Sequence, residues 1–337
     1  MINIDNLVRP NIRSLKPYST ARDEYTGHEA IYLDANENPY GTWNRYPDPH
    51  QADLKKALSL RKNIPLENIF IGNGCDEVID LALRIFCTPG VHKVIICPPT
   101  YGMYEVAAHI NDLEIIYIPL TEEFQLNIDE ILRTDATFLF LCSPNNPTGN
   151  HLKNIETILT RFNGIVFVDE AYIDFSDHPS LLSRIDRYSN LIVSQTLSKA
   201  WGHAAARIGM AYSGKEIIQY FNKTKPPYNI SSLNQKAAVD ALQHVDLYKE
   251  NLLKIHDAKT WLIHELSALN IVSAIYPSDA NFLLVEMINA DDIYHYLIEQ
   301  KIITRNRSNV VKDCLRITIG TPKENKTLIN ALKEISQ

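Results

Sequence analysis

The stretch TFLFLCSPNNPTGNHLKNIETILTRFNGIVFVDEAY, residues 137–172, contains the pattern that decides the fold. An apolar run at Thr137–Cys142 is followed by turn residues, by the amphipathic segment Asn154–Phe162 and by a second apolar run at Ile165–Val168. Short apolar runs of this kind are typical of parallel strands whose two faces are both covered. The stretch therefore predicts a strand, a helix and a second, parallel strand.

Similar apolar runs occur on both sides of this stretch, at Lys93–Cys97 and Leu191–Val193, and each is followed by turn residues. The amphipathic segment Glu77–Phe86 precedes the first of them. Alternation of buried strands with helices is typical of an α/β fold with a mostly parallel central sheet. Because ligands in such folds bind at the carboxyl ends of the strands, the residues after each run are candidates for a site.

The pattern changes after Pro226 and Pro227. A long helical region follows at 232–269, and two further expected strands, Asn281–Glu286 and Leu315–Ile319, come after it. We therefore expect three parts, which are an N-terminal arm at residues 1–30, a large domain at 31–231 and a smaller α+β domain at 232–337.

The composition disfavours several classes of protein. With 337 residues, of which 45% are hydrophobic, the chain can bury a substantial core. Its formal charge of −7 disfavours an extended nucleic-acid surface, and no stretch has the apolar length of a membrane span or a signal peptide. Five cysteines without a CxxC pair indicate reduced thiols. We expect a cytoplasmic protein with no structural metal and no nucleic-acid or membrane partner.

Lys199 is the first candidate for chemistry, in the segment SQTLSKAWGHAAARIG, residues 194–209. A lone lysine is usually a solvated surface residue, so its neighbours carry the argument. The hydroxyl groups of Thr196 and Ser198 can donate to a phosphate, and Arg207 offers a forked cation for the same anion. Each of these, taken alone, is as well explained by a turn or a surface ion pair.

Asp169 and Asn146 are candidates at the ends of the two central apolar runs. The prolines and glycine of SPNNPTG, residues 143–149, fix a turn that presents Asn146 at a defined angle. Asp169 ends a buried run, and a buried carboxylate needs a cation or donor such as a protonated ring nitrogen. Tyr172 follows three residues later. The alternatives are a tight loop for Asn146, a helix cap or salt bridge for Asp169 and core packing for Tyr172.

A candidate anion site occurs in IFIGNGCDEVIDLA, residues 69–82, where a strand turns into a helix. The amides of Gly74, Cys75 and Asp76 can cradle a phosphate at the positive end of that helix, unless the acidic residues only complement the helix dipole. Tyr101, in PPTYGMY, follows another strand and could stack on a flat cofactor or pack in the core. Together these segments supply an amine, an acid, an amide and phosphate donors, which are the groups that pyridoxal 5′-phosphate (PLP) requires.

Short segments along the whole chain match a known family in the same order: NIRSLKPYSTAR, LDANENPYG, NRYPDPH, GNGCDE, PPTYGMY, SPNNPTG, VDEAY, TLSKAWG, ARIG and CLRITIGT. With them the chain resembles fold type I PLP enzymes, and specifically histidinol-phosphate aminotransferases. The resemblance implies that Lys199 forms the Schiff base with PLP and that Asp169 pairs with its ring nitrogen, with Tyr172 as the third catalytic residue. The cofactor-binding residues that it implies are Gly74, Cys75, Asp76, Tyr101, Asn146, Asp169, Tyr172, Thr196, Ser198, Lys199 and Arg207.

The resemblance also implies a second subunit and a substrate pocket. Tyr46, in the RYPD segment, would reach the cofactor of a neighbouring subunit, so a homodimer with shared sites is expected. Tyr18, Arg305 and Arg316 would hold the phosphate or carboxylate of the substrates, and Arg307 competes with Arg305 for that role.

The activity implied is transfer of an amino group between histidinol phosphate and 2-oxoglutarate, giving imidazole acetol phosphate and glutamate in histidine biosynthesis. Three alternatives stay open, which are a PLP decarboxylase of the threonine-phosphate type, an aromatic amino acid aminotransferase and a non-catalytic binding protein that retains the fold. The chain departs from the family at His203, to which no role is assigned, and in the short segment between Arg305 and Arg316.

Overall fold

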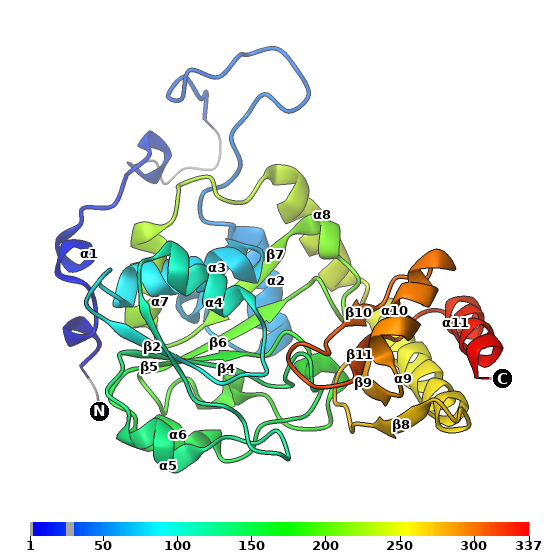
Figure 1. Cartoon of the computed structure of the whole chain (residues 1–337). Coiled ribbons are helices and arrows are strands. Elements are labelled where there is room, and N and C mark those ends of the chain that lie inside the picture. The colour runs from blue at the N-terminus through cyan, green and yellow to red at the C-terminus, as the bar shows by residue number, and fades with distance from the viewer. Residues whose placement is uncertain (1–2, 25–29, 337) are drawn as a thin grey trace.

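A seven-stranded sheet forms the centre of the larger part of the molecule (Figure 1). The structure is a computed structural model that describes residues 3–24 and 30–336. Its strands lie in the order β1-β7-β6-β5-β4-β2-β3, and only β7 runs antiparallel to its neighbours. The expected α/β fold with a mostly parallel sheet is confirmed. The strands are β1 (Ile69–Asn73), β2 (Lys93–Ile96), β3 (Glu114–Tyr117), β4 (Phe138–Cys142), β5 (Ile165–Asp169), β6 (Leu191–Thr196) and β7 (Ile208–Tyr212).

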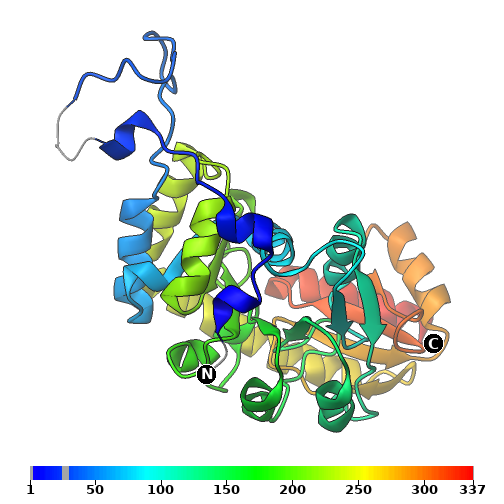
Figure 2. The ribbon, with the colours of Figure 1, turned by 90° about the vertical axis from the view of Figure 1, so that its left-hand side faces the viewer.

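Helices cover both faces of this sheet (Figures 1 and 2). In β4, Phe138 and Phe140 point into one core and Leu139 and Leu141 into the other, which is why the strand lacks polar alternation. One face is covered by α1 (Pro10–Ser14), α3 (Gly74–Phe86), α4 (Met103–Ile110) and α7 (Lys215–Thr224), and the other by α2 (Ala52–Lys62), α5 (Ile128–Arg133), α6 (Ile155–Arg161) and α8 (Ser232–Gln243).

A four-stranded antiparallel sheet follows in the chain, with a core of its own. Its strands lie in the order β10-β11-β9-β8. Helix α11 starts with a capping box between Thr321 and Glu324, which satisfies the free amides of its first turn. The elements are α9 (Val245–Ser267), β8 (Val272–Ile275), β9 (Phe282–Met287), α10 (Ala290–Glu299), β10 (Arg305–Asn306), β11 (Cys314–Thr318) and α11 (Pro322–Ile335).

The long helical region expected at 232–269 is two helices, because α8 ends at Gln243 and α9 begins at Val245, with His244 between them. Ala238 and Leu242 of α8 pack into the core of the large sheet, whereas Leu262 of α9 belongs to the core of the small sheet. The expected domain boundaries stay a prediction, and the packing of α8 favours a boundary between α8 and α9.

The N-terminal segment differs from the extended arm that was expected. Ile4, Val8 and Ile12 recur every four residues and are buried against the body, and short helices form at Ile4–Asn6 and Pro10–Ser14. Described residues between α1 and α2 do stand away from the body, as the blue loop at the top of Figure 1 shows. Short 3-10 helices occur at Ile4–Asn6, Ala21–Glu24, Leu66–Asn68, Ile173–Phe175, Leu181–Arg184 and Ala204–Ala206.

In the ranges that the structure describes, no helix has both the length and the apolar character needed to cross a membrane. The five cysteines are free thiols, and all except Cys75 are buried.

Candidate active site

A cavity of about 360 Å³ lies at the edge of the large sheet where its parallel strands end. Strand β10, the residue Arg307 that follows it and strand β11 also line the cavity, so residues of both sheets contribute to it. Its lining residues are Cys75, Asp76, Tyr101, Cys142, Asn146, Asp169, Ala171, Tyr172, Thr196, Ser198, Lys199, Arg207, Arg305, Arg307 and Arg316. The structure therefore brings most of the predicted site residues together, and the cavity leaves out Gly74, Tyr18 and Tyr46.

Asp169, the last residue of β5, is a buried acid at the bottom of this site. Its carboxylate accepts hydrogen bonds from the hydroxyl of Tyr104 at 2.8 Å and from the amide of Ala171 at 3.0 Å. In the described part of the chain it has no salt bridge, and burial raises the pKa of Asp169 although both hydrogen bonds lower it. The charge of Lys199 also lowers this pKa, so the site offers a buried carboxylate that interacts with a cation without forming a salt bridge in the described residues.

Tyr104 is a residue that the sequence analysis missed. It is fully buried in α4, stacked on Phe140, and its hydroxyl reaches Asp169 across the sheet edge. Its place in PPTYGMY, one helical turn after Tyr101, is the only local signal, and packing explains that signal equally well. Asp169, which accepts the hydrogen bond of Tyr104, is distant in the chain and comes near it because β2 and β5 belong to one sheet.

Lys199 follows β6 and lines the cavity. Its Nζ lies 5.4 Å from the centre of the Tyr172 ring. Burial lowers the pKa of Lys199, and the positive charge of Arg316 lowers it further. The amine is therefore neutral, and able to react, at a lower pH than an exposed lysine. His203 is not a lining residue, and its Nδ1 lies 2.5 Å from the carbonyl oxygen of Trp201.

The start of α3 and the side chain of Arg207 form a candidate anion site. Gly74 has a φ of +78°, and a Cβ atom there would lie 2.5 Å from the Nη2 atom of Arg207. The first amides of a helix have no intrahelical acceptor and carry partial positive charge, so those of residues 74–76 can bind a phosphate. Asp76 pairs with Arg207 at 3.1 Å and holds the guanidinium over the helix start.

The hydroxyl groups of Thr196 and Ser198 also belong to this candidate anion site. Thr196 ends β6, and its Oγ1 lies 3.0 Å from Oγ of Ser198. Arg207 joins them because it directly precedes β7, whose antiparallel direction places its first residue at the edge where β6 ends. The Cys75 thiol points away to the carbonyl of Gln195, and burial raises its pKa to about 12, so only its amide can serve an anion.

Asn146 and Tyr172 face the small sheet. Nη1 of Arg316, in β11, donates to Oδ1 of Asn146 at 2.5 Å. The Tyr172 ring packs edge-to-face on Phe282 of β9, with centroids 5.1 Å apart. Both contacts join residues of the large sheet to residues of the small one. Tyr101 lines the wall above Asp169, with its ring edge-on to Tyr104 at 5.5 Å.

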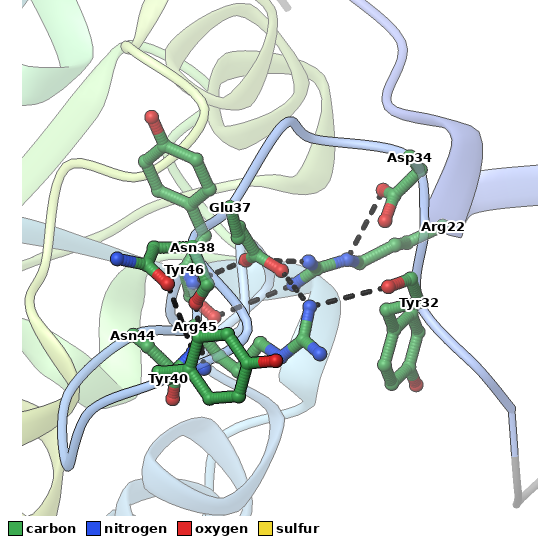
Figure 3. Close-up of polar contacts among 9 residues, drawn as sticks. All are labelled: Arg22, Tyr32, Asp34, Glu37, Asn38, Tyr40, Asn44, Arg45 and Tyr46. Carbon is green, nitrogen blue, oxygen red and sulfur yellow. Dashed lines mark hydrogen bonds and ion pairs between the residues drawn. The ribbon is translucent and has the colours of Figure 1, made fainter.

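Tyr46 and Tyr18 lie outside this cavity, on the segment that stands away from the body. Figure 3 shows how that segment is held: the Glu37 carboxylate accepts from Arg22, Arg45 and the amide of Tyr46, at 2.7, 2.6 and 2.6 Å. These donors lower the pKa of Glu37 to about 2. The Tyr46 ring stacks on Tyr228, and Tyr18 is 75% exposed. A single chain therefore does not bring either tyrosine to the cavity.

The chain is similar to known proteins over nearly its whole length. It matches the family described as aminotransferase class I and II over residues 24–332. A protein of Cytophaga hutchinsonii named histidinol-phosphate aminotransferase is 52% identical, over 98% of this chain and 99% of its own length. A protein of the same name from Christiangramia forsetii is 49% identical, over 99% and 98%. The crystal structure of histidinol-phosphate aminotransferase from Sinorhizobium meliloti, in complex with pyridoxal-5′-phosphate, has a TM-score of 0.79 at 25% identity and covers 87% of this chain and 83% of its own.

Proposed function

Because this chain belongs to the family of class I and II aminotransferases, we propose that it transfers an amino group from histidinol phosphate to 2-oxoglutarate with PLP as cofactor. The products are imidazole acetol phosphate and glutamate, in a step of histidine biosynthesis. The observation that carries the proposal is the cavity itself, which brings together a lysine of lowered pKa, a buried carboxylate and several arginines. Among the described residues, Asp169 forms no salt bridge, and neither do Arg305, Arg307 and Arg316.

The residues of the cavity fit PLP. Asp169 has no salt bridge in the described ranges, and the protonated ring nitrogen of PLP is the cation that would stabilise its charge. The amides of residues 74–76, the hydroxyls of Thr196 and Ser198 and the fork of Arg207 would hold the phosphate. Bound PLP supplies an aldehyde that bonds to amines and a ring that withdraws electrons from the carbon bearing the amine.

The residues around the ring then have separate tasks. Lys199 would hold the cofactor through its Nζ, and the same Nζ, when free, would accept the proton of the substrate carbon. The same Nζ would also be the group that gives the proton back. Asn146 and Tyr172 would orient the ring through its phenolic oxygen, and Tyr101 would stack on its face.

Arg316 would bind the anionic group of both substrates in turn. Its fork suits a carboxylate and a phosphate alike, and it already reaches Asn146 beside the ring. Arg305 lies directly opposite Arg316 in the pairing of β10 with β11 and would support the same anion.

A panel of substrates tests the proposed function. We expect the purified protein with PLP to form glutamate from 2-oxoglutarate faster with histidinol phosphate than with phenylalanine, because only the first carries a phosphate for the arginines. Carbon dioxide release from threonine phosphate is measured in parallel. The proposal is wrong if phenylalanine is the better donor or if decarboxylation is the faster reaction.

We propose that two chains share their active sites in a homodimer. The segment that carries Tyr46 stands away from its own body and exposes large apolar side chains, a surface that needs a partner. In a twofold dimer such a segment can lie over the cavity of the second chain, where Tyr46 would reach the cofactor phosphate. The exposed apolar residues are Ile31, Leu33, Tyr40, Trp43 and Tyr46.

Mixed dimers test this sharing. A dimer of one Lys199→Ala chain and one Tyr46→Ala chain has one site with both defects and one site with neither. We therefore expect the purified hybrid to regain about half of the native activity, although each parent is impaired. Differently tagged chains are co-expressed and the hybrid is isolated by both tags.

Tyr117→Ala is the control, because Tyr117 is an exposed tyrosine of β3 and lies outside that segment. Its homodimer should stay active. A hybrid of the Lys199 and Tyr46 variants that is no more active than the mean of its parents would mean that each site is built from one chain.

We also propose a cytoplasmic location. A reducing compartment suits a chain whose five cysteines are all free thiols, and the proposed reaction belongs to amino acid biosynthesis.

A further inference from the structure

Three guanidinium groups lie in the part of the cavity that is assigned to the substrate. The sequence predicted two arginines there, Arg305 and Arg316, with Arg307 as a competitor for the role of Arg305. Arg305, Arg307 and Arg316 all line the cavity. Arg305 and Arg316 are paired in register on β10 and β11. The amide of Arg307 donates to the carbonyl of Cys314 at 2.9 Å, so the hairpin geometry continues through Arg307.

Strand alternation explains why Arg307 points inward. Alternate residues of an extended chain share a face, so Arg305 and Arg307 lie on one side and Asn306 on the other. The side chain of Asn306 does turn away, and its Nδ2 donates to Asp291 at 2.6 Å. Arg305 is exposed and also borders a second cavity next to Asp291, whereas Arg307 is partly buried and lines only the main one.

None of the three arginines forms an ion pair within the described residues. The Nε atoms of Arg307 and Arg316 are buried and have no hydrogen-bond acceptor there. Like charges placed opposite each other, and donors buried without acceptors, both destabilise a folded chain. The pKa of Arg307 is lowered by burial and by the charges of Arg316 and Arg305. Such a cluster is stabilised by an anion of more than one charge.

The two substrates differ in the anionic group that they would present to these three arginines. A phosphate monoester carries close to two charges on three oxygens and can accept from more than one guanidinium fork. A carboxylate has one charge and two oxygens, which a single fork satisfies. The candidate site for the cofactor phosphate is built from other residues, which are those at the start of α3, Thr196 and Arg207.

We propose that Arg307 binds the phosphate of the amino-group donor and makes this pocket prefer a phosphate monoester to a carboxylate. The inference rests on the proposed function. It assigns the third arginine to substrate selection, with Arg316 common to both substrates and Arg307 serving the phosphate.

Steady-state kinetics of Arg307→Gln test the inference. We expect the KM for histidinol phosphate to rise by about 10- to 100-fold, the range for one hydrogen-bonded charge, with kcat and the KM for 2-oxoglutarate changed less than about threefold. Arg307→Lys keeps the charge and loses the fork, so it should recover part of the lost affinity. Lys312→Gln removes a charge from the same hairpin at a side chain that is 92% exposed, and it should behave like the native chain.

A second measurement separates failure of the inference from failure of the proposed function. Inorganic phosphate should inhibit the native enzyme, and its inhibition constant should rise by the same factor in Arg307→Gln, whichever amino donor is assayed. Equal increases in the KM of both substrates would show a general structural role and overturn the inference. So would an unchanged KM for histidinol phosphate and an unchanged inhibition constant for phosphate. If histidinol phosphate is no donor for the native chain, the proposed function fails, and the phosphate inhibition still decides the role of Arg307.

Discussion

Lys199→Ala is expected to slow amino transfer by about 10⁴-fold, the largest effect of any single substitution in this chain. In the proposed function the lysine has two tasks that no neighbour can take over, because it would hold the cofactor and would also move the proton. Glutamate formation from histidinol phosphate and 2-oxoglutarate measures the loss. Borohydride reduction followed by peptide mapping measures the covalent bond directly, and the modified peptide should contain Lys199 and be missing from the variant.

Lys236→Ala is the control for this substitution. Lys236 is a well-exposed lysine that pairs with Asp240 on the surface of α8, so its loss should leave the activity unchanged. A Lys199→Ala enzyme that keeps more than about a hundredth of the native rate would contradict the role given to Lys199.

Asp169→Asn is expected to lower kcat by about 10²- to 10³-fold, the usual cost of removing one preorganised electrostatic group. The carboxylate is buried, oriented by Tyr104 and Ala171, and forms no salt bridge in the described residues, so its negative charge is available to a protonated ring. Asparagine keeps the shape and loses the charge. The affinity for PLP, followed by its absorbance, should fall far less than kcat because the phosphate contacts lie elsewhere.

Glu170→Gln is a stringent control, because Glu170 is the next residue and equally buried. Its carboxylate accepts hydrogen bonds from Ser180, Leu181 and Gln195, away from the cavity. We expect this variant to lose stability and to keep its kcat. If Asp169→Asn and Glu170→Gln lower kcat alike, the loss comes from a disturbed strand end and Asp169 has no special role.

The fold and the centre of the site could be predicted because both follow from local patterns. Short apolar runs predicted β2, β4, β5 and β6, whereas β3 and β7 were not predicted. Lys199, Asp169 and Asn146 each follow one of these runs. Parallel strands end at one edge of a sheet, so the three side chains had to lie near each other once the runs were recognised.

Order along the chain was thus enough to identify the sheet, the strand ends and the resemblance to the aminotransferases. Three features depended on contacts between distant segments: the hydrogen bond from Tyr104 to Asp169, the absence of a carboxylate beside Arg307 in the described chain, and the position of Tyr46 outside its own cavity. Burial and charge pairing are set by whatever residue packs nearby in space. That neighbour can lie anywhere in the chain, or in a second copy of it, so no local pattern records it.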